Sequence, residues 1–295
     1  IISGGAGDDV IYGIGGANFL YGGLENDTFI GKLTGNDFID GESGNDKVDY
    51  SNLSSANSIT VNLGTTTTRA DEQGNLQTVY EISKKDGASD FVKNISIFEG
   101  SAGNDTFTVG AGNYTFIGGA GDDTFNGSNF KDVLIDGGSH INGDYVDYSS
   151  VADKIIISLQ DGSDPTTVQV GGDTTNHTIR NIENIIGSNT ADTITGNSSN
   201  NTIKGGGGDD IIDGTGGNNY LDGELGSDTV SFESVTSVNG ISVNIGNSAV
   251  TINGNTYAAS SAIRNGFTST VVNFENIQGS KNADILIGSD ESNII

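Results

Sequence analysis

The nine residues GGAGDDVIY (4–12) carry the pattern from which the fold of this 295-residue chain can be predicted. Its template, GGxGxDxUx with U a large apolar residue, returns in frame as GGLENDTFI (22–30), GSAGNDTFT (100–108), GGAGDDTFN (118–126), GSNTADTIT (187–195), GGGGDDIID (205–213) and GSKNADILI (279–287). Six Gly-rich residues form a turn and three form a short strand, so two nonapeptides complete one coil. Stacking of the coils at the ordinary strand spacing of about 4.8 Å gives a parallel solenoid. The repeat therefore predicts an all-β, right-handed parallel β-roll or β-helix solenoid.

The apolar eighth residue of each nonapeptide is expected to point inward and to stack on its copies in neighbouring coils. Ile11, Phe29 and Val48 should line one sheet, and Leu20 and Ile39 the other. Hydrophobic residues make up only 33% of the chain, so this core is thin.

The charge of the chain restricts its partners. Asp and Glu number 39 against 12 Lys and Arg, which gives a formal net charge of -27. Nucleic acid would be repelled, whereas cations would be attracted. The chain has no Cys, which excludes disulfides and thiolate sites, and no apolar run approaches the length of a membrane span. Only two His are present, and no nucleophile motif accompanies them, so we expect no enzyme activity.

The sixth residue of alternate nonapeptides forms an uninterrupted Asp column on one edge of the predicted roll. Stacked carboxylates repel one another unless a cation lies between them, and Gly-rich turns can aim backbone carbonyls at that cation. Carboxylate and carbonyl oxygens suit Ca²⁺ better than a transition metal. We therefore expect several calcium ions between successive members of each block of the column, which are Asp9, Asp27 and Asp46; Asp105, Asp123 and Asp144; and Asp192, Asp210 and Asp228. The alternative is that these are solvated turn residues chosen for turn propensity.

The other edge of the roll is mixed. Its sixth residues are Asn18 and Asp37; Tyr114 and Asp132; and Asn201 and Asn219. The Asn positions are expected to form an amide ladder without metal. Asp37, Asp132 and Asp284, the first Asp of the last block, are further candidate ligands.

In its nonapeptides the chain resembles the RTX (repeats-in-toxin) family of calcium-binding β-rolls. The resemblance implies that backbone oxygens complete each site. It assigns this role to Gly5 and Gly7 with Gly22 and Leu24; to Gly23 and Glu25 with Gly41 and Ser43; to Gly103, Gly118, Gly119, Ala120 and Gly121; and to Gly205, Gly206, Gly207 and Gly208 with Gly223 and Leu225. Extra residues in the turn that ends at Asp144 are expected to distort its site.

Three connecting segments separate the blocks and share phrases with one another. They open on VDYSNLSSANSITVNLG (48–64), VDYSSVADKIIISLQDG (146–162) and VSFESVTSVNGISVNIG (230–246), and they close on NISIFEGS (94–101), NIENIIGS (181–188) and NFENIQGS (273–280). We expect nonapeptide blocks at 1–49, 100–148, 187–230 and 279–295, with connecting β segments at 50–99, 149–186 and 231–278, as one continuous solenoid. The connectors should add wider coils, with 65–93, 163–178 and 247–270 bulging outward.

The resemblance predicts a structural role for the chain. It is that of a calcium-binding segment of a secreted bacterial cell-surface protein, an S-layer protein or an adhesin, exported by type I secretion and folding in extracellular calcium. Copies of the chain in a surface assembly are expected partners. The alternative is the non-catalytic C-terminal region of a secreted hydrolase or toxin. A carbohydrate-binding module would need exposed aromatic platforms, for which Tyr80 and Tyr257 are modest candidates.

Overall fold

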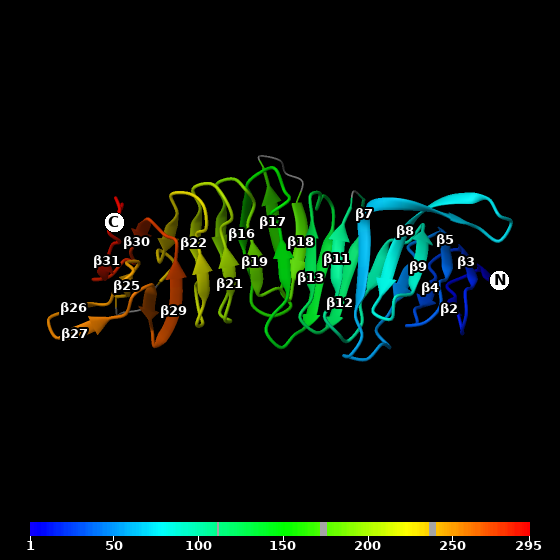
Figure 1. Cartoon of the computed structure of the whole chain (residues 1–295), viewed down its shortest axis with the longest axis horizontal. Coiled ribbons are helices and arrows are strands. Elements are labelled where there is room, and N and C mark those ends of the chain that lie inside the picture. Colours follow the sequence, from blue (N-terminus) through cyan, green and yellow to red (C-terminus); the bar gives the residue numbers. More distant parts are fainter. Residues whose placement is uncertain (111, 172–175, 236–239) are drawn as a thin grey trace. The chain divides into compact units, whose positions relative to one another are not determined.

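The computed structural model describes residues 1–110, 112–171, 176–235 and 240–295 (Figure 1). Every regular element in these ranges is a strand. The described residues contain no helix long and apolar enough to cross a membrane. The chain divides into two compact units. Unit 1 comprises Ile1–Tyr145 and His177–Asn181, and unit 2 comprises Val146–Asn176 and Ile182–Ile295.

Unit 1 contains parts of two sheets that face each other across its core. The first sheet has the order β1 (Ile2–Ala6), β3 (Phe19–Leu24), β5 (Phe38–Ser43), β9 (Ser89–Lys93), β8 (Leu76–Lys84), β7 (Ile59–Ala70), β11 (Thr106–Val109) and β13 (Thr124–Gly127). The second has the order β2 (Val10–Tyr12), β4 (Thr28–Ile30), β6 (Lys47–Asp49), β10 (Ile97–Glu99), β12 (Thr115–Ala120), β14 (Leu134–Ser139) and β18 (Asn176–Arg180).

Unit 2 repeats the same construction. One sheet has the order β19 (Asn184–Ile186), β21 (Thr202–Lys204), β23 (Tyr220–Asp222), β29 (Phe267–Val272), β28 (Ser261–Arg264), β25 (Ser242–Asn244) and β31 (Ile285–Ile287). The other has the order β17 (Thr166–Val170), β16 (Ile155–Ser158), β20 (Thr193–Thr195), β22 (Ile211–Asp213), β24 (Thr229–Ser231) and β30 (Asn276–Gln278). A hairpin of β26 (Val250–Ile252) and β27 (Asn255–Tyr257) is separate, and β15 (Tyr145–Asp147) contains the point where the chain leaves unit 1.

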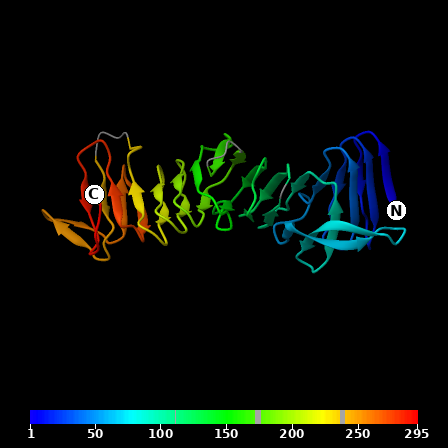
Figure 2. The same cartoon turned by 90° about the horizontal axis from the view of Figure 1, so that it is seen from above.

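The nonapeptide strands pair in parallel, one coil apart, as predicted. Ile11 pairs with Phe29 and Phe29 with Val48, while Leu20 pairs with Ile39 on the opposite sheet. All five side chains are buried. Viewed from above, the first coils stack side by side (blue in Figure 2). The β-roll expected from the repeat is therefore the observed architecture.

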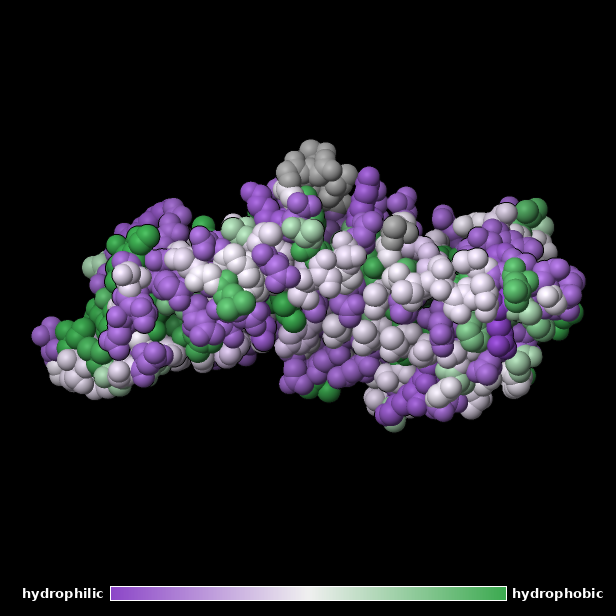
Figure 3. All heavy atoms as spheres, turned by 45° about the horizontal axis from the view of Figure 1, so that its top comes forward, coloured by the Kyte–Doolittle hydropathy of each residue, from purple (hydrophilic) through white to green (hydrophobic). Residues whose placement is uncertain are grey.

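The core is a set of side-chain stacks between the two sheets. Phe107 and Phe125 stack with ring centroids 4.9 Å apart, and Phe98 and Phe116 stack at 5.7 Å. Burying one such side chain contributes roughly 2 kcal/mol. The exterior is mostly polar, with scattered apolar residues (Figure 3). Because the core is so thin, interactions in the turns contribute a large share of the free energy of folding.

The connectors differ from the expectation of wider parallel coils. In the first, β8 lies antiparallel between β7 and β9, so residues 76–93 belong to the sheet; only the outer part of the β7–β8 hairpin extends beyond it (Figure 1). In the third, β28 lies antiparallel between β25 and β29, and in the second, β16 pairs antiparallel with β17. The expectation that 65–93 and 247–270 bulge outward as a whole was therefore wrong. Asp-Gly at 86–87 and Asn-Gly at 265–266 are tight-turn signals, with φ of 88° at Gly87 and 50° at Asn265, that favour hairpins.

Candidate metal centres

Within each block the Asp column lies at the turns that precede strands of a single sheet, which are β2, β4 and β6 in the first block, β11, β13 and β15 in the second, and β20, β22 and β24 in the third. The column therefore changes sheets between the first and the second block. One oxygen of each carboxylate after Asp9 links neighbouring coils. The backbone N–H of Asp9 donates to Asp27 Oδ1 at 2.9 Å, and that of Asp27 donates to Asp46 Oδ1 at 2.8 Å. The same bond joins Asp105 to Asp123, Asp123 to Asp144, Asp192 to Asp210 and Asp210 to Asp228, at 2.7–2.8 Å. The structure thus brings together every pair of carboxylates that the sequence aligned.

The other carboxylate oxygen is buried and has no hydrogen-bond partner in six of these residues. They are Asp9, Asp27, Asp46, Asp123, Asp210 and Asp228, in each of which Oδ2 is the orphaned atom. An ionised oxygen that is removed from water without a donor is costly unless a cation compensates it. The ladder bond on Oδ1 fixes the orientation of the carboxylate, so Oδ2 is held in place for such a cation.

Each orphaned Oδ2 lies beside a backbone carbonyl oxygen, over the Cα of the first glycine of its own turn. A Cβ built on Gly4 would overlap Asp9 Oδ2 and lie 2.8 Å from the carbonyl oxygen of Gly22. The same test at Gly22 meets Asp27 Oδ2 and the carbonyl of Gly41, and at Gly205 it meets Asp210 Oδ2 and the carbonyl of Gly223. The first glycine is therefore required so that two oxygens can converge there. A carboxylate oxygen without a donor, beside a carbonyl oxygen, forms a cradle for a hard cation, which fits Ca²⁺.

The electrostatics of the column agree with this geometry. Burial raises the pKa of Asp123 to about 8 and that of Asp210 to about 7, and their neighbours in the column add to both shifts. Burial likewise raises the pKa of Asp228 to about 6, with a further contribution from Glu275. The pKa of Asp46 is raised for the same reasons, by burial and then by Asp27. Without a cation, the folded chain resists having these groups ionised.

Connector residues complete the last cradle of each block, which the sequence did not predict. The carbonyl of Asn94 takes the place of a turn glycine beside Asp46 Oδ2, and the carbonyl of Asn273 does so beside Asp228 Oδ2. Both Asn have positive φ, 54° and 55°, and their side chains donate to Asp40 and Asp222. The signal was the Asn that opens the shared phrases NISIF and NFENI.

The turn before Asp144 differs from the others. Its additional residues place His140 Nδ1 3.8 Å from Asp144 Oδ2, and the carbonyl of Asn181 lies against the same cradle, at Gly137. An imidazole thus lies beside the carboxylate in this turn, and distortion of a calcium site here stays a prediction.

Several backbone groups that the resemblance assigns as calcium ligands lie at these cradles. Others form hydrogen bonds between neighbouring turns. The carbonyls of Gly22, Gly41 and Gly223 face the orphaned oxygens. The carbonyl of Gly206 accepts the N–H of Leu225 at 3.0 Å, and the carbonyl of Leu225 accepts that of Gly208 at 2.9 Å. Calcium ligation by Gly5, Gly7, Leu24 and the other backbone groups stays a prediction.

Hydrogen bonds link the turns of the mixed edge where Asn forms it. Asn201 N–H donates to Asn219 Oδ1 at 2.8 Å, which is the expected amide ladder. At Asn18, both the backbone N–H and the side-chain amide donate to Asp37 Oδ1. Asp132 does not lie in this column. It is exposed, and buried Val133 precedes β14 in its place because that turn contains one more residue than we aligned.

A lysine neutralises the last carboxylate of this edge in the first connector. Lys84 Nζ donates to Asp90 Oδ1 at 2.8 Å and to the carbonyl of Gly35 at 2.7 Å, with both charged side chains fully buried. Asp37 N–H donates to Asp90 Oδ1, and Tyr50 OH donates to Asp90 Oδ2 at 2.5 Å. This ammonium contacts a carboxylate and a turn carbonyl, the two groups that form the cradles on the other edge. The sequence did not reveal it, because both residues lie in a variable stretch.

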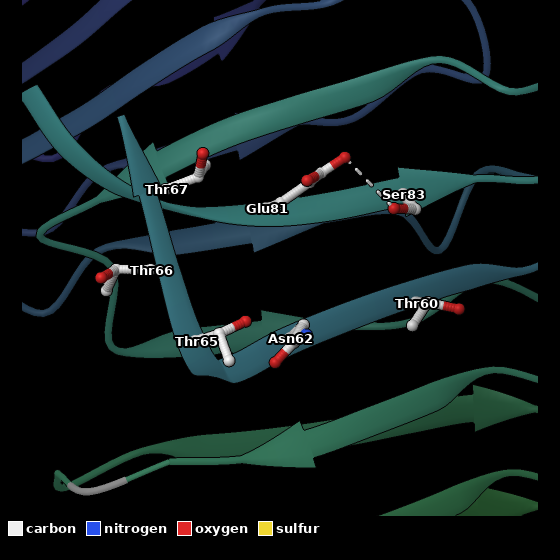
Figure 4. A pocket seen from close by; sticks show the side chains of 7 residues that line it. All are labelled: Thr60, Asn62, Thr65, Thr66, Thr67, Glu81 and Ser83. Carbon is white, nitrogen blue, oxygen red and sulfur yellow. Dashed lines mark hydrogen bonds between the residues drawn. The ribbon is translucent and has the colours of Figure 1, made fainter. Parts of the chain in front are cut away.

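A polar pocket beside β7 and β8 is lined by Thr60, Asn62, Thr65, Thr66, Thr67, Glu81 and Ser83 (Figure 4). Glu81, its one charged side chain, accepts hydrogen bonds from Ser83 and Ser89. Tyr80 and Tyr257, the candidate carbohydrate platforms, are half-buried. His177 is buried with its ring against Phe130, and burial lowers its pKa to about 4.

The fold and the carboxylate column together define a calcium-binding β-roll. Comparison with protein families matches the RTX calcium-binding nonapeptide repeat in residues 1–29, 33–52, 99–134, 186–221 and 195–230. These segments thus match the repeat that the sequence indicated, and they contain the carboxylate column. No curated protein matches the chain.

Proposed function

We propose that this chain is a structural segment of a secreted cell-surface protein that folds when it meets extracellular calcium. The observation that carries the proposal is the set of buried Oδ2 atoms that face carbonyl oxygens and have no donor. The family match to calcium-binding repeats supports the metal, and the net charge of -27 supports the need for it.

The mechanism is metal-coupled folding. In a compartment with little calcium, the ionised column opposes stacking of the coils, and the chain stays extended enough for export. Millimolar calcium outside the cell fills the cradles and binds the folded form alone. A site at tenfold its dissociation constant contributes about 1.4 kcal/mol by mass action, so several sites act together. Type I secretion and a place in an S-layer or an adhesin belong to this proposal.

Far-UV circular dichroism of the whole chain tests the folding step. The chain is measured in EDTA and then titrated with calcium, with magnesium as the control ion because it demands a tighter octahedral site. The proposal expects a coil-like spectrum that changes cooperatively to β-structure near millimolar calcium, and little response to magnesium. A β spectrum that EDTA leaves unchanged would refute metal-coupled folding.

A further inference from the structure

The first nonapeptide after each connector differs from the others at its second residue. Ser101, Ser188 and Ser280 occupy that position. Turns with an orphaned carboxylate have a residue with positive φ there. Examples are Gly5 at 107°, Gly206 at 100° and Glu224 at 65°. None of the three serines is among the residues with positive φ. The backbone of these turns therefore follows a different path.

That path turns the serine toward the carboxylate of its own turn. Ser188 N–H donates to Asp192 Oδ2 at 2.6 Å and Ser188 Oγ donates to Asp192 Oδ1 at 2.9 Å, while Ile155 N–H donates to Oδ1 at 2.7 Å. Ser101 and Ser280 make the corresponding bonds to Asp105 and Asp284, at 2.5–2.9 Å, and Ile59 and Ile241 supply the ladder bond. The same arrangement thus occurs three times.

The serine also closes its own turn. Ser188 Oγ accepts the N–H of Thr190 at 3.1 Å, and Ser101 Oγ accepts that of Gly103 at 3.0 Å. In turns with an orphaned carboxylate the fourth residue has positive φ, whereas Gly103, the fourth residue of its turn, does not. The turn is therefore complete without a ligand.

A neighbouring turn on the other edge shows the same principle with different residues. Asn197, also second in its nonapeptide, donates its N–H to Asn201 Oδ1 at 3.0 Å, and Asn201 Nδ2 donates to Asn197 Oδ1 at 3.0 Å. A side chain at the second position thus satisfies the sixth residue directly.

A carboxylate whose two oxygens both accept hydrogen bonds has its charge compensated by donors. A cation at Asp192 Oδ2 would have to displace the Ser188 N–H, whereas at Asp210 Oδ2 it displaces nothing.

We propose that Ser101, Ser188 and Ser280 are metal-independent caps, so that the second residue of a nonapeptide selects between calcium and internal hydrogen bonds. This inference rests on the proposed calcium binding. The calcium row after each connector then begins at Asp123 or Asp210, and Asp105, Asp192 and Asp284 bind no ion. Each connector ends on a turn that folds before calcium arrives and offers a template for the coils that follow.

Native mass spectrometry of the whole chain at saturating calcium tests the caps. The Asp192→Asn variant should retain as many ions as the wild type, and Asp210→Asn should lose one. The Ser188→Gly variant should gain one ion, and the control Ser198→Gly, at an exposed position in the next turn, should gain none. Loss of an ion in Asp192→Asn, or an unchanged count in Ser188→Gly, overturns the caps while leaving calcium binding intact. A wild-type chain that binds no calcium overturns the caps and the proposed function together.

Discussion

Replacing Asp123 by Asn should stabilise the metal-free fold and weaken the calcium-bound one. The amide oxygen can still accept the N–H of Asp105, as Asn219 accepts that of Asn201. The amide nitrogen replaces the orphaned Oδ2 and can donate to the carbonyl of Gly137. The substitution thus removes a buried charge and keeps the ladder.

The magnitude follows from the pKa of Asp123, which burial raises from 3.8 to about 8. A raised folded-state pKa means that the penalty for ionisation starts near pH 3.8 and grows by about 1.4 kcal/mol per pH unit until pH 8. At pH 7 it is at most about 4 kcal/mol, and at pH 5 about 1.6 kcal/mol. The free energy of unfolding of Asp123→Asn in EDTA should exceed that of the wild type by up to these amounts.

Urea unfolding at both pH values, in EDTA and in calcium, measures this difference. All stability measurements in EDTA contain one fixed concentration of a stabilising osmolyte, so that the metal-free chain is folded before it is denatured. The control is Asp122→Asn, which changes the same formal charge at a carboxylate that accepts hydrogen bonds from Ile141 and Asn142. The control should lose stability in EDTA. In calcium, Asp123→Asn should be less stable than the wild type, because the variant lacks one calcium ligand. If Asp123→Asn is destabilised in EDTA as Asp122→Asn is, the account of the orphaned oxygen is wrong.

Three further predictions concern pH, a glycine and the buried lysine. In EDTA the wild-type chain should gain stability as the pH falls from 8 to 5, because the folded pKa values of Asp123, Asp210 and Asp228, about 8, 7 and 6, all lie above 3.8; thermal melts that fall on acidification in this window would contradict it. Gly205→Ala should remove one calcium ion and lower the calcium-bound melting temperature, because its Cβ would fill the cradle of Asp210, whereas Gly207→Ala, with no contact closer than 3.6 Å, should do neither in calorimetric titration. Lys84→Met should cost about 3–5 kcal/mol in EDTA and in calcium alike, because it leaves Asp90 buried without its cation; a loss seen only in one of the two conditions, or an equal loss in the exposed neighbour Lys85→Met, would argue against this role.

The sequence predicted the roll and the Asp column because both follow from a strict period. Once Ile11, Phe29 and Val48 stack, the Asp residues two positions before each of them must stack as well. The period also exposed the mixed edge, where only Asp132 was aligned wrongly, by one residue. A nine-residue period, however, does not specify which carboxylate oxygens lack a hydrogen-bond donor.

The parts that the sequence did not reveal depend on residues that break the period. The antiparallel strands β8 and β28 follow from local turn signals that we read as bulges. The Lys84–Asp90 pair and the carbonyls of Asn94 and Asn273 come from connectors, whose partners are set by tertiary contacts far along the chain. The three serines can be seen in the sequence. A nonapeptide template records only which residue stands at the second position, whereas the φ of that residue determines where its N–H points.

Anomalous diffraction from crystals of the whole chain grown in calcium locates each bound ion, and it therefore tests whether the orphaned Oδ2 atoms bind calcium. We expect an anomalous peak roughly 2.3–2.6 Å from Oδ2 of Asp9, Asp27, Asp46, Asp123, Asp210 and Asp228. No peak should lie beside Asp105 or Asp192. A column without peaks, or calcium found only at exposed carboxylates elsewhere, would contradict the account.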